Sequence, residues 1–247
     1  MADVFAPVLE GTDPTDLDSC RRLMRQITVN SGARAGVEMA LHDAVAQSAG
    51  IPLFEFYGGR SRPAVPTIWH VSGGDPASNA EEAARAVHED GFRLVKVKVG
   101  GDVDVDIAKM WAVREAVGPD VMLIPDANQG WDPDSSIRFC QAVAGAHPAF
   151  LEQPVLRNDV AGMARVNAGP VRVAADEGVF DVTDLRTHLV LAAPNLMYGA
   201  GTCPYYLAGD IVAEPLQVEA GMLHPPAGPG LGLHLDPDLV KRYRLDV

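Results

Sequence analysis

Cysteine is scarce in this sequence, and its three copies, Cys20, Cys140 and Cys203, lie far apart along the chain. Domains that depend on disulfides contain many closely spaced cysteines in even number, and structural zinc sites use short-range cysteine pairs. Neither pattern is present. We therefore expect reduced thiols, no disulfide framework and no cysteine zinc site, and we predict a cytoplasmic protein.

Basic residues are also few. Lys and Arg total 20 against 33 Asp and Glu, which gives a formal net charge of −13 at pH 7. A surface this acidic repels the phosphates of nucleic acids and the headgroups of anionic lipids. We expect neither nucleic acid nor membrane as a partner, and an anionic small substrate would need a local positive feature, such as a metal ion or buried lysines.

Long apolar runs and common nucleotide motifs are missing too. The most apolar stretch, 189–213, is interrupted by Pro194, Asn195, Pro204 and several glycines, so it does not read as a membrane span. The first residues carry no basic and apolar signal segment, and we expect no signal peptide. Neither GxGxxG nor GxxxxGK[ST] follows an expected strand, which removes the usual support for dinucleotide or nucleoside triphosphate binding.

The order of apolar patterns predicts two kinds of structure. Residues 1–60 are expected to be mostly helical, with a helix over 31–50, and Gly58, Gly59 and Pro63 mark a boundary. Beyond it, strands are predicted at 65–71, 94–99, 121–125, 149–152 and 171–175, and helices at 78–90, 103–117, 133–144 and 160–167. Strands and helices that alternate with crossovers of this length predict a parallel sheet.

The residues that end these strands recur at regular intervals. Lys98, Asp126, Glu152 and Asp176 are separated by 28, 26 and 24 residues. Eight units of that size form a TIM-type (β/α) barrel of about 250 residues. We predict this α/β barrel, with a doubly wound open sheet as the alternative; in both, functional groups lie at the carboxyl ends of the strands.

Three of the strand ends carry an acid: Asp126, Glu152 and Asp176. Carboxylates that converge repel one another, so we expect a cation between them. Oxygen-only ligands favour Mg²⁺, with Mn²⁺ as the alternative. Glu177 follows Asp176 directly, and because adjacent strand residues point to opposite faces, only one of the two can face the centre. The competing interpretation treats these acids as helix N-caps or turn residues.

Two lysines alternate with valines on the preceding strand. In Leu94–Gly100, Lys96 and Lys98 lie on one face and the valines on the other. Because valines suit the helix-packed outer face of a barrel, we expect the lysines to point into its mouth, although an edge strand with one wetted face is the alternative. Each ammonium disfavours the charge on the other, so one pKa should fall toward neutrality and create a base. A metal ion could then stabilise the enediolate that forms when this base removes an α-proton from a carboxylate.

In this order and spacing, the motifs resemble the enolase superfamily, in its muconate lactonizing enzyme (mandelate racemase/muconate cycloisomerase-like) subgroup. They are Lys96-Val97-Lys98, Asp126-Ala127-Asn128-Gln129-Gly130-Trp131, Glu152-Gln153-Pro154 and Ala175-Asp176-Glu177. Residues 32–43, with Pro52-Leu53 and Gly58-Gly59, are similar to the helical part of that family's capping domain. Residues 228–232 and 235–237 are similar to the C-terminal return to it. The resemblance implies cap helices over 1–60, a barrel over 61–220 and the return over 221–247.

The resemblance also implies a role for each motif. Lys98 would be the base and Lys96 its tuning neighbour, the three strand-end acids Asp126, Glu152 and Asp176 would bind Mg²⁺, and Asn128 would support the metal. The implied reaction is isomerisation of a small carboxylate by a cycloisomerase, racemase or epimerase, in a homo-oligomer. The alternatives are a dehydratase acting by syn β-elimination, a Schiff-base aldolase that uses Lys96 or Lys98, and a non-catalytic degenerate barrel.

Two departures from the family pattern bear on the chemistry. The cap's first strands are missing before Met1, and the 71 residues after Asp176 are too few for three further units of about 25 residues each plus the return. Units six to eight are therefore expected to be largely missing, together with the sixth-strand lysine that acts on the opposite face. We favour the interpretation that segments of a longer protein are omitted, which leaves racemase and epimerase chemistry open. The alternative is an internally deleted form, and the sequence taken literally favours one-base chemistry. His70, His188, His224 and His234 belong to no motif, and we expect them to be structural or surface residues.

Overall fold

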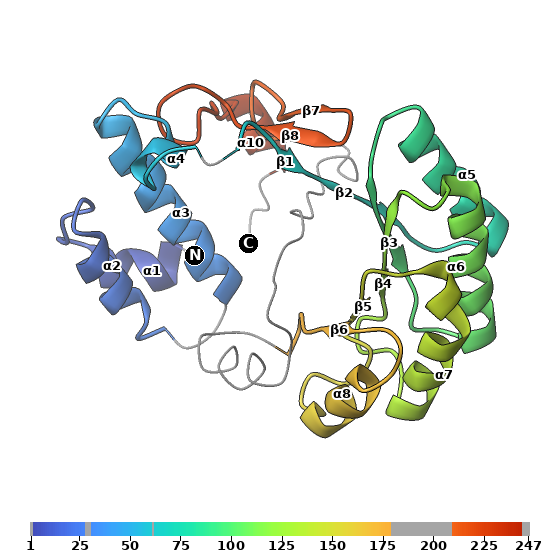
Figure 1. Cartoon of the computed structure of the whole chain (residues 1–247). Helices are drawn as coiled ribbons and strands as arrows, with labels where there is room; N and C mark the ends of the chain where they lie inside the picture. Colours follow the sequence, from blue (N-terminus) through green and yellow to red (C-terminus); the bar gives the residue numbers. More distant parts are fainter. Residues whose placement is uncertain (1, 28–30, 61, 179–208, 244–247) are drawn as a thin grey trace. The chain divides into compact units, whose positions relative to one another are not determined.

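The computed structural model describes residues 2–27, 31–60, 62–178 and 209–243 (Figure 1). They form two compact units. The first holds the described residues up to 64, together with 209–217 and 224–243, and the second holds 65–178 and 218–223. The expected loss of units six to eight falls on 179–208, and this segment, with His188 and Cys203, lies outside the described residues.

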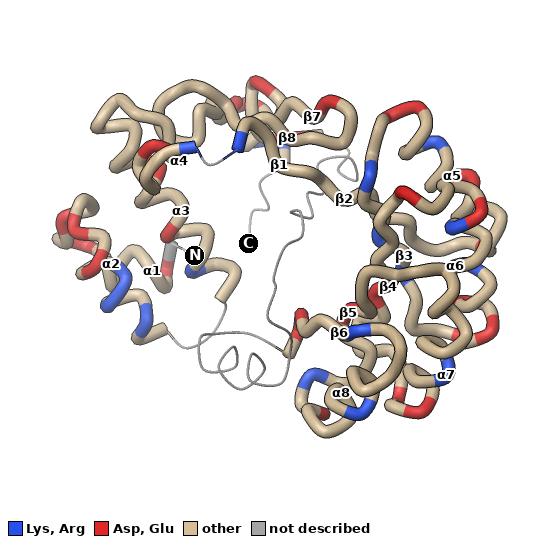
Figure 2. The backbone as a smooth tube through the Cα atoms, viewed as in Figure 1, with Lys and Arg blue, Asp and Glu red and all other residues tan. Residues whose placement is uncertain are grey.

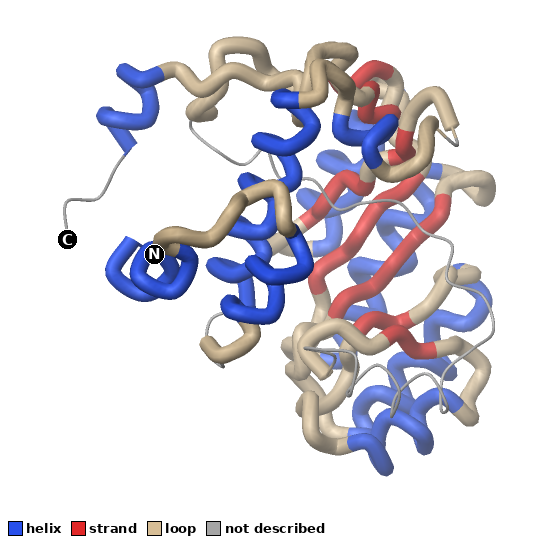
Figure 3. Tube along the Cα trace, turned by 90° about the vertical axis from the view of Figure 1, so that its left-hand side faces the viewer, coloured by secondary structure: helices blue, strands red, loops and turns tan. Residues whose placement is uncertain are grey.

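The second unit is built on a five-stranded parallel sheet. Its strands lie in sequence order: β2 (Ile68–Val71), β3 (Leu94–Lys98), β4 (Met122–Asp126), β5 (Leu151–Glu152) and β6 (Val173–Ala174). The helices between them are α5 (Pro76–His88), α6 (Val103–Val117), α7 (Pro133–Val143), followed by a 3₁₀ turn, and α8 (Val160–Asn167). Figures 1 and 3 show these helices on one side of the sheet. A doubly wound sheet reverses its strand order and has helices on both faces, so the observed order is that of a TIM-type barrel.

The two faces of this sheet differ in chemistry. Trp69, Val71, Val95, Val97 and Leu123 pack into the apolar cluster formed with the helices. The residues that alternate with them face the other way, which places Lys96, Lys98, Asp126 and Glu152 on the inner face. The valine and lysine alternation of β3 therefore matches the expected outer and inner faces.

Aspartates start the helices of this unit, but they are not the strand-end acids. Asp75, Asp102, Asp132 and Asp159 are the N-caps of α5, α6, α7 and α8, and each side chain accepts a backbone N–H of the first turn. Asp126 and Glu152 therefore cap none of these helices, although Asp126 also accepts the backbone N–H of Asn128 at 3.1 Å, as a turn residue does. Because Asp75 is a cap and Pro76 takes the first helical position, α5 also begins two residues earlier than expected.

The predicted strand over 65–71 is two strands. β1 (Val65–Pro66) pairs with β8 (Met222–His224) in a small sheet that also contains β7 (Gln217–Glu219), while β2 joins the parallel sheet. The chain changes sheets at Thr67, whose backbone N–H and hydroxyl both donate to the carbonyl oxygen of Gly221, at 2.8 and 2.7 Å.

The first unit combines the N-terminal helices with the C-terminal segment. Its helices are α1 (Ala2–Leu9), α2 (Leu17–Met24), α3 (Ser31–Ser48), α4 (Leu53–Phe56) and α10 (Pro237–Tyr243). Gly230 joins them, because its N–H donates to Ile51 O and its carbonyl accepts from Leu53 N, at 2.9 and 2.7 Å. Its positive φ of 67° and its approach to Asp43 leave no room for a side chain.

Residues 209–217 belong to this first unit, although we expected the barrel to extend to 220. The reason is backbone pairing: Ala213 N donates to His234 O at 2.8 Å and Asp236 N donates to Ile211 O at 2.9 Å. The segment therefore pairs with the C-terminal return rather than with a barrel strand. No helix in the described part of the chain has the length and apolar composition that a membrane crossing needs.

Candidate functional site

Four charged side chains meet at the carboxyl ends of β3, β4 and β5. Lys98 is the register partner of Asp126, and Asp126 is the register partner of Glu152. The Lys98 ammonium donates to Asp126 Oδ2 at 2.7 Å, and the Lys96 ammonium donates to Glu152 Oε1 at 2.8 Å and to Asp126 Oδ2 at 3.4 Å. Figure 2 shows charges of both signs at these strands. The structure thus brings together both predicted lysines and two of the three predicted acids.

Asn128 extends this network from the loop after β4. Its side-chain oxygen accepts a hydrogen bond from the Lys98 ammonium at 2.7 Å, and its amide group donates to Glu177 Oε1 at 3.0 Å. The backbone of Asn128 is left-handed, with φ of 42°, a conformation that asparagine tolerates better than most residues. Asn128 therefore contacts the predicted base directly.

Asp176, the third predicted acid, is held through its backbone. Its N–H and that of Gly178 both donate to the side-chain oxygen of Gln153, at 2.9 and 3.0 Å. Gln153 is buried, and its own amide group donates to Val155 O at 3.0 Å. From the sequence, Gln153 received no role, and Glu177 was the alternative to Asp176 for the residue that faces the centre; the structure brings the Glu177 carboxylate to Asn128. The signal available was a polar residue directly beside an acid at a strand end.

The pKa of Glu152 reflects the repulsion between the acids of the site. Burial raises the pKa of Glu152, and the negative charges of Asp126 and Asp176 raise it further, while Lys96 acts in the opposite direction. The carboxylates are thus close enough to disfavour one another's charge. A positive charge between the carboxylates relieves this repulsion. The ammonium of Lys96 supplies some of that positive charge.

The pKa of Lys96 does not show the fall that was expected for one of the two lysines. Burial acts to lower the pKa of Lys96, but the hydrogen bond and charge of Glu152, together with the charge of Asp126, outweigh it and raise that pKa. The sequence argument counted burial and the neighbouring lysine. It did not count two carboxylates that reach the same ammonium from adjacent strands.

The donor set fits a hard divalent cation in its chemistry. Its members are carboxylate oxygens that repel one another, which is the kind of ligand that Mg²⁺ prefers. Within the described residues, however, no three His, Cys, Asp or Glu side chains are gathered closely enough to hold a metal ion. The Lys96 ammonium bridges Asp126 and Glu152, so a cation there would replace its hydrogen bonds to them.

The loop after β3 is held in place by a buried carboxylate. Asp106 accepts the N–H groups of Gly100 and Gly101, at 2.9 and 2.8 Å, and the Lys109 ammonium at 2.9 Å. The indole of Trp131 donates to Gly101 O at 2.8 Å. Gly130 lies against the backbone of Gly100 so closely that a Cβ there would collide with it. These contacts tie the loop that follows Lys98 to the loop that carries Asn128.

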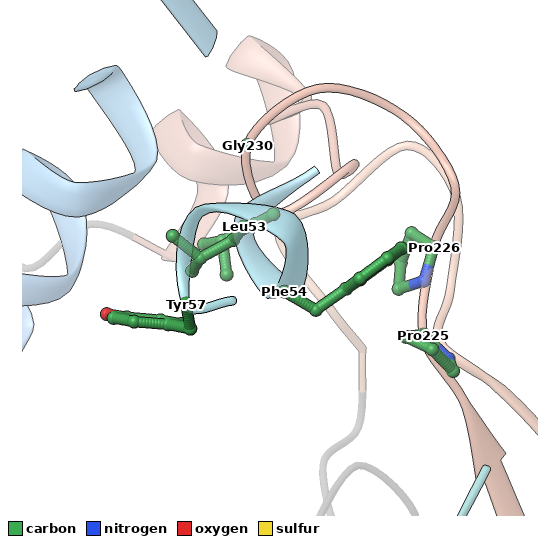
Figure 4. Close-up of a pocket in the computed structure, with 7 residues that line it drawn as sticks. Leu53, Phe54, Tyr57, Pro225, Pro226 and Gly230 are labelled. Atoms are coloured by element: carbon green, nitrogen blue, oxygen red, sulfur yellow. The ribbon is translucent and has the colours of Figure 1, made fainter. Parts of the chain in front are cut away.

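A separate apolar pocket lies in the first unit (Figure 4). It has a volume of about 260 Å³. The lining residues come from α4 and the C-terminal segment: Leu53, Phe54, Tyr57, Pro225, Pro226, Gly230 and Leu231. The pocket has no acid, lysine or histidine in its lining, and it shares no residue with the cluster of charged groups. It therefore does not offer the acid and base groups that proton transfer needs.

Two family models match most of the chain. Residues 78–193 match the model described as enolase C-terminal domain-like, and residues 1–58 match the mandelate racemase/muconate lactonizing enzyme N-terminal domain. The chain belongs to the mandelate racemase/muconate lactonizing enzyme family. It is therefore an enzyme of the enolase superfamily, whose barrel carries isomerase chemistry and whose members generally depend on a divalent metal.

The relatives of this family member are isomerases. Muconate cycloisomerase 1-2 of Acinetobacter lwoffii is 29% identical over 98% of this chain and 78% of that protein. The hydrophobic dipeptide epimerase of Enterococcus faecalis is 33% identical over 74% of this chain and 51% of that protein. The crystal structure of muconate cycloisomerase from Pseudomonas fluorescens superposes with a TM-score of 0.88 at 29% identity, covering 99% of this chain and 84% of that one.

One alignment shows how the chain differs in length. The match to the Acinetobacter cycloisomerase spans 299 positions, although this chain has 247 residues. Parts of the relative's aligned sequence therefore have no counterpart here. In the sequence itself, no lysine occurs between Lys109 and Lys241.

Proposed function

We propose that this enzyme removes the α-proton of a small carboxylate substrate with Lys98 as the base, and that the product is an isomer. The observation that carries the proposal is the position of the Lys98 ammonium, between Asp126 on the next strand and Asn128 on the loop that follows. Two polar groups, one at the end of the neighbouring strand β4 and one on the loop after it, can hold this nitrogen at a defined place. A base must be held in this way to reach one proton of a bound substrate.

The two lysines are suited to different tasks. The side chain of Lys98 is 33% exposed, whereas that of Lys96 is 12% exposed and hydrogen-bonded to Glu152. Lys98 is therefore the one that can reach a substrate, and Lys96 remains a fixed positive charge beside it. We assign Lys96 the task of stabilising the negative charge that develops on the substrate, since an oriented cation in a partly buried site does so effectively.

The proposed metal ligands are Asp126, Glu152 and Asp176, with Mg²⁺ as the ion and Mn²⁺ as the alternative. When bound, such an ion supplies the positive charge that makes the α-proton of a carboxylate more acidic. Gln153 supports this set because it holds the backbone of Asp176 in place. The Lys96 hydrogen bonds to Asp126 and Glu152 occupy the same oxygens, so metal binding and these hydrogen bonds compete.

One-base cycloisomerisation is the form of the reaction that the lysines of this chain favour. Racemisation and epimerisation need a base on each face of the α-carbon, and no lysine occurs between Lys109 and Lys241 to serve on the second face. The muconate cycloisomerase relative also matches 98% of the chain. Epimerisation is the second candidate, favoured by the higher identity of the dipeptide epimerase relative.

The test is deuterium exchange at the α-carbon, with Mg²⁺ and a library of small carboxylates in D2O. The wild-type chain should incorporate deuterium into at least one substrate. Lys98→Ala should lower the rate by at least about 100-fold, since a positioned base contributes about that much or more. Lys241→Ala, which removes an exposed lysine on α10, is the matched control and should leave the rate unchanged.

The other reaction classes give different results in companion experiments. An aldolase would form a borohydride-trappable adduct at Lys96 or Lys98, which we expect to be absent. A degenerate scaffold would show no heat of Mg²⁺ binding in calorimetry and no exchange with any substrate. Unchanged exchange in Lys98→Ala would reject the proposed base. We also propose a homo-oligomer, which sedimentation velocity tests directly.

A further inference from the structure

His70 lies on the inner face of the sheet, beside the two lysines. It is the register partner of Lys96 on the adjacent parallel strand, and partners in a parallel pair point to the same face. Its chain neighbours Trp69 and Val71 both pack into the cluster on the helix side. Alternation therefore turns His70 away from the helices and toward the face that carries Lys96 and Lys98.

The same face also carries buried apolar residues. Ile68, two residues before His70, and Ile124, the register partner of Lys96 on β4, are buried but do not belong to the helix-side cluster. His70 itself is half-buried. The imidazole thus shares its face of the sheet with buried apolar residues and with the two lysines.

The charges of the site act on the ring. Burial lowers the pKa of His70, and Lys96 and Lys98 lower it further, while Asp126 acts in the opposite direction. The ring is therefore neutral at neutral pH and has one nitrogen that donates and one that accepts. Such a ring can hydrogen-bond an amide, a hydroxyl or a carboxylate without adding a third positive charge to the site.

We propose that His70 is a specificity-determining residue, which hydrogen-bonds a polar group that the substrate carries on the β2 side of Lys96. From its sequence position we expected this histidine to be structural or on the surface, and it lies in none of the motifs quoted above. The inference rests on the proposed function, because it requires a carboxylate substrate held at Lys98. We expect kcat/KM to be higher for substrates that carry a hydrogen-bonding group at this place than for substrates of the same shape that carry an apolar group there.

The experiment compares isosteric substrate pairs in the α-deuterium exchange assay. The library contains L-alanyl-L-threonine with L-alanyl-L-valine, and L-alanyl-L-asparagine with L-alanyl-L-leucine, besides other pairs of polar and apolar carboxylates. His70→Leu should lower kcat/KM about tenfold or more on the polar member of a pair and leave the apolar member within about threefold, since one hydrogen bond is worth about a tenfold change. His70→Gln retains a donor and an acceptor and should restore most of the preference.

The matched control is His88→Leu on the outer helix α5. His88 is exposed, and its ring nitrogen contacts Ala116 O at 3.1 Å, so this variant should leave the preference unchanged. Circular dichroism melts establish that each variant is folded before its rates are compared. If His70→Leu lowers both members of each pair equally, His70 is a structural residue and the inference is wrong. If the wild-type chain exchanges no carboxylate of the library, the proposed function itself has failed.

Discussion

Replacing Asp106 by alanine should lower the free energy of unfolding of the second unit by about 4 kcal/mol. Its carboxylate is 1% exposed and accepts three hydrogen bonds, from Gly100 N, Gly101 N and the Lys109 ammonium. Hydrogen bonds to a charged group contribute roughly 1.5–3 kcal/mol each, and they are not additive. Breaking a buried pair by removing one partner costs about 3–5 kcal/mol, because the other charge stays buried without compensation.

Asp106→Asn separates the two kinds of contact. The asparagine oxygen can still accept the glycine N–H groups, but its amide group faces an ammonium that is 13% exposed, so we expect a loss of about 2 kcal/mol. Adding Lys109→Met to Asp106→Asn should recover part of that loss, because the unpaired cation is removed. Equilibrium urea denaturation, followed by tryptophan fluorescence, measures all three variants.

The control for Asp106 is a neighbour on the same helix. Asp104→Ala removes an exposed carboxylate that pairs with Arg138 at the surface, where solvent screens the pair, so it should cost far less stability than Asp106→Ala. The reasoning would be refuted if Asp106→Ala and Asp104→Ala proved equally stable. It would also be refuted if the Lys109→Met addition destabilised Asp106→Asn further.

Two further predictions concern Gly130, which lies against the backbone of Gly100, and the buried Cys140. Gly130→Ala should destabilise the protein by about 1–3 kcal/mol in thermal denaturation, because its Cβ meets the backbone of Gly100. Gly36→Ala, in α3 with open space at the Cβ position, should instead stabilise it by about 0.5–1 kcal/mol, and equal effects would contradict the assignment. Burial raises the pKa of Cys140 to about 12, so its thiol stays protonated at pH 8 and should resist iodoacetamide until the chain is unfolded. Peptide mapping checks this, and rapid labelling of native Cys140 would contradict it.

Local sequence patterns were enough to predict most elements of the second unit. The helices Val103–Val117 and Val160–Asn167 have the predicted bounds, because their limits depend on local caps and stop signals. The last two strands were predicted too long: β5 and β6 are two residues each. A strand's length depends on which backbone groups a neighbouring strand pairs with, and the apolar pattern does not contain that information.

In the candidate site, too, some features could be predicted from the sequence and others depend on contacts between strands. Which residues end the strands can be read from the motifs, and Lys96, Lys98, Asp126 and Glu152 do meet as their positions indicate. The electrostatic state of Lys96 could not be predicted, because it is set by two carboxylates that arrive from other strands. His70 was missed for the same reason, since its proximity to Lys96 is a matter of strand register.

By itself the sequence determined the alternation of strands and helices, the capping aspartates and the chemistry at each strand end. All of these depend on residues that are close in the chain. Only the tertiary structure decided the strand order, the face on which His70 lies and the partners of each ammonium, because these depend on contacts between residues that are distant in the chain. Hydrogen bonds and Coulomb interactions act over a few ångströms in space, whatever the separation in sequence.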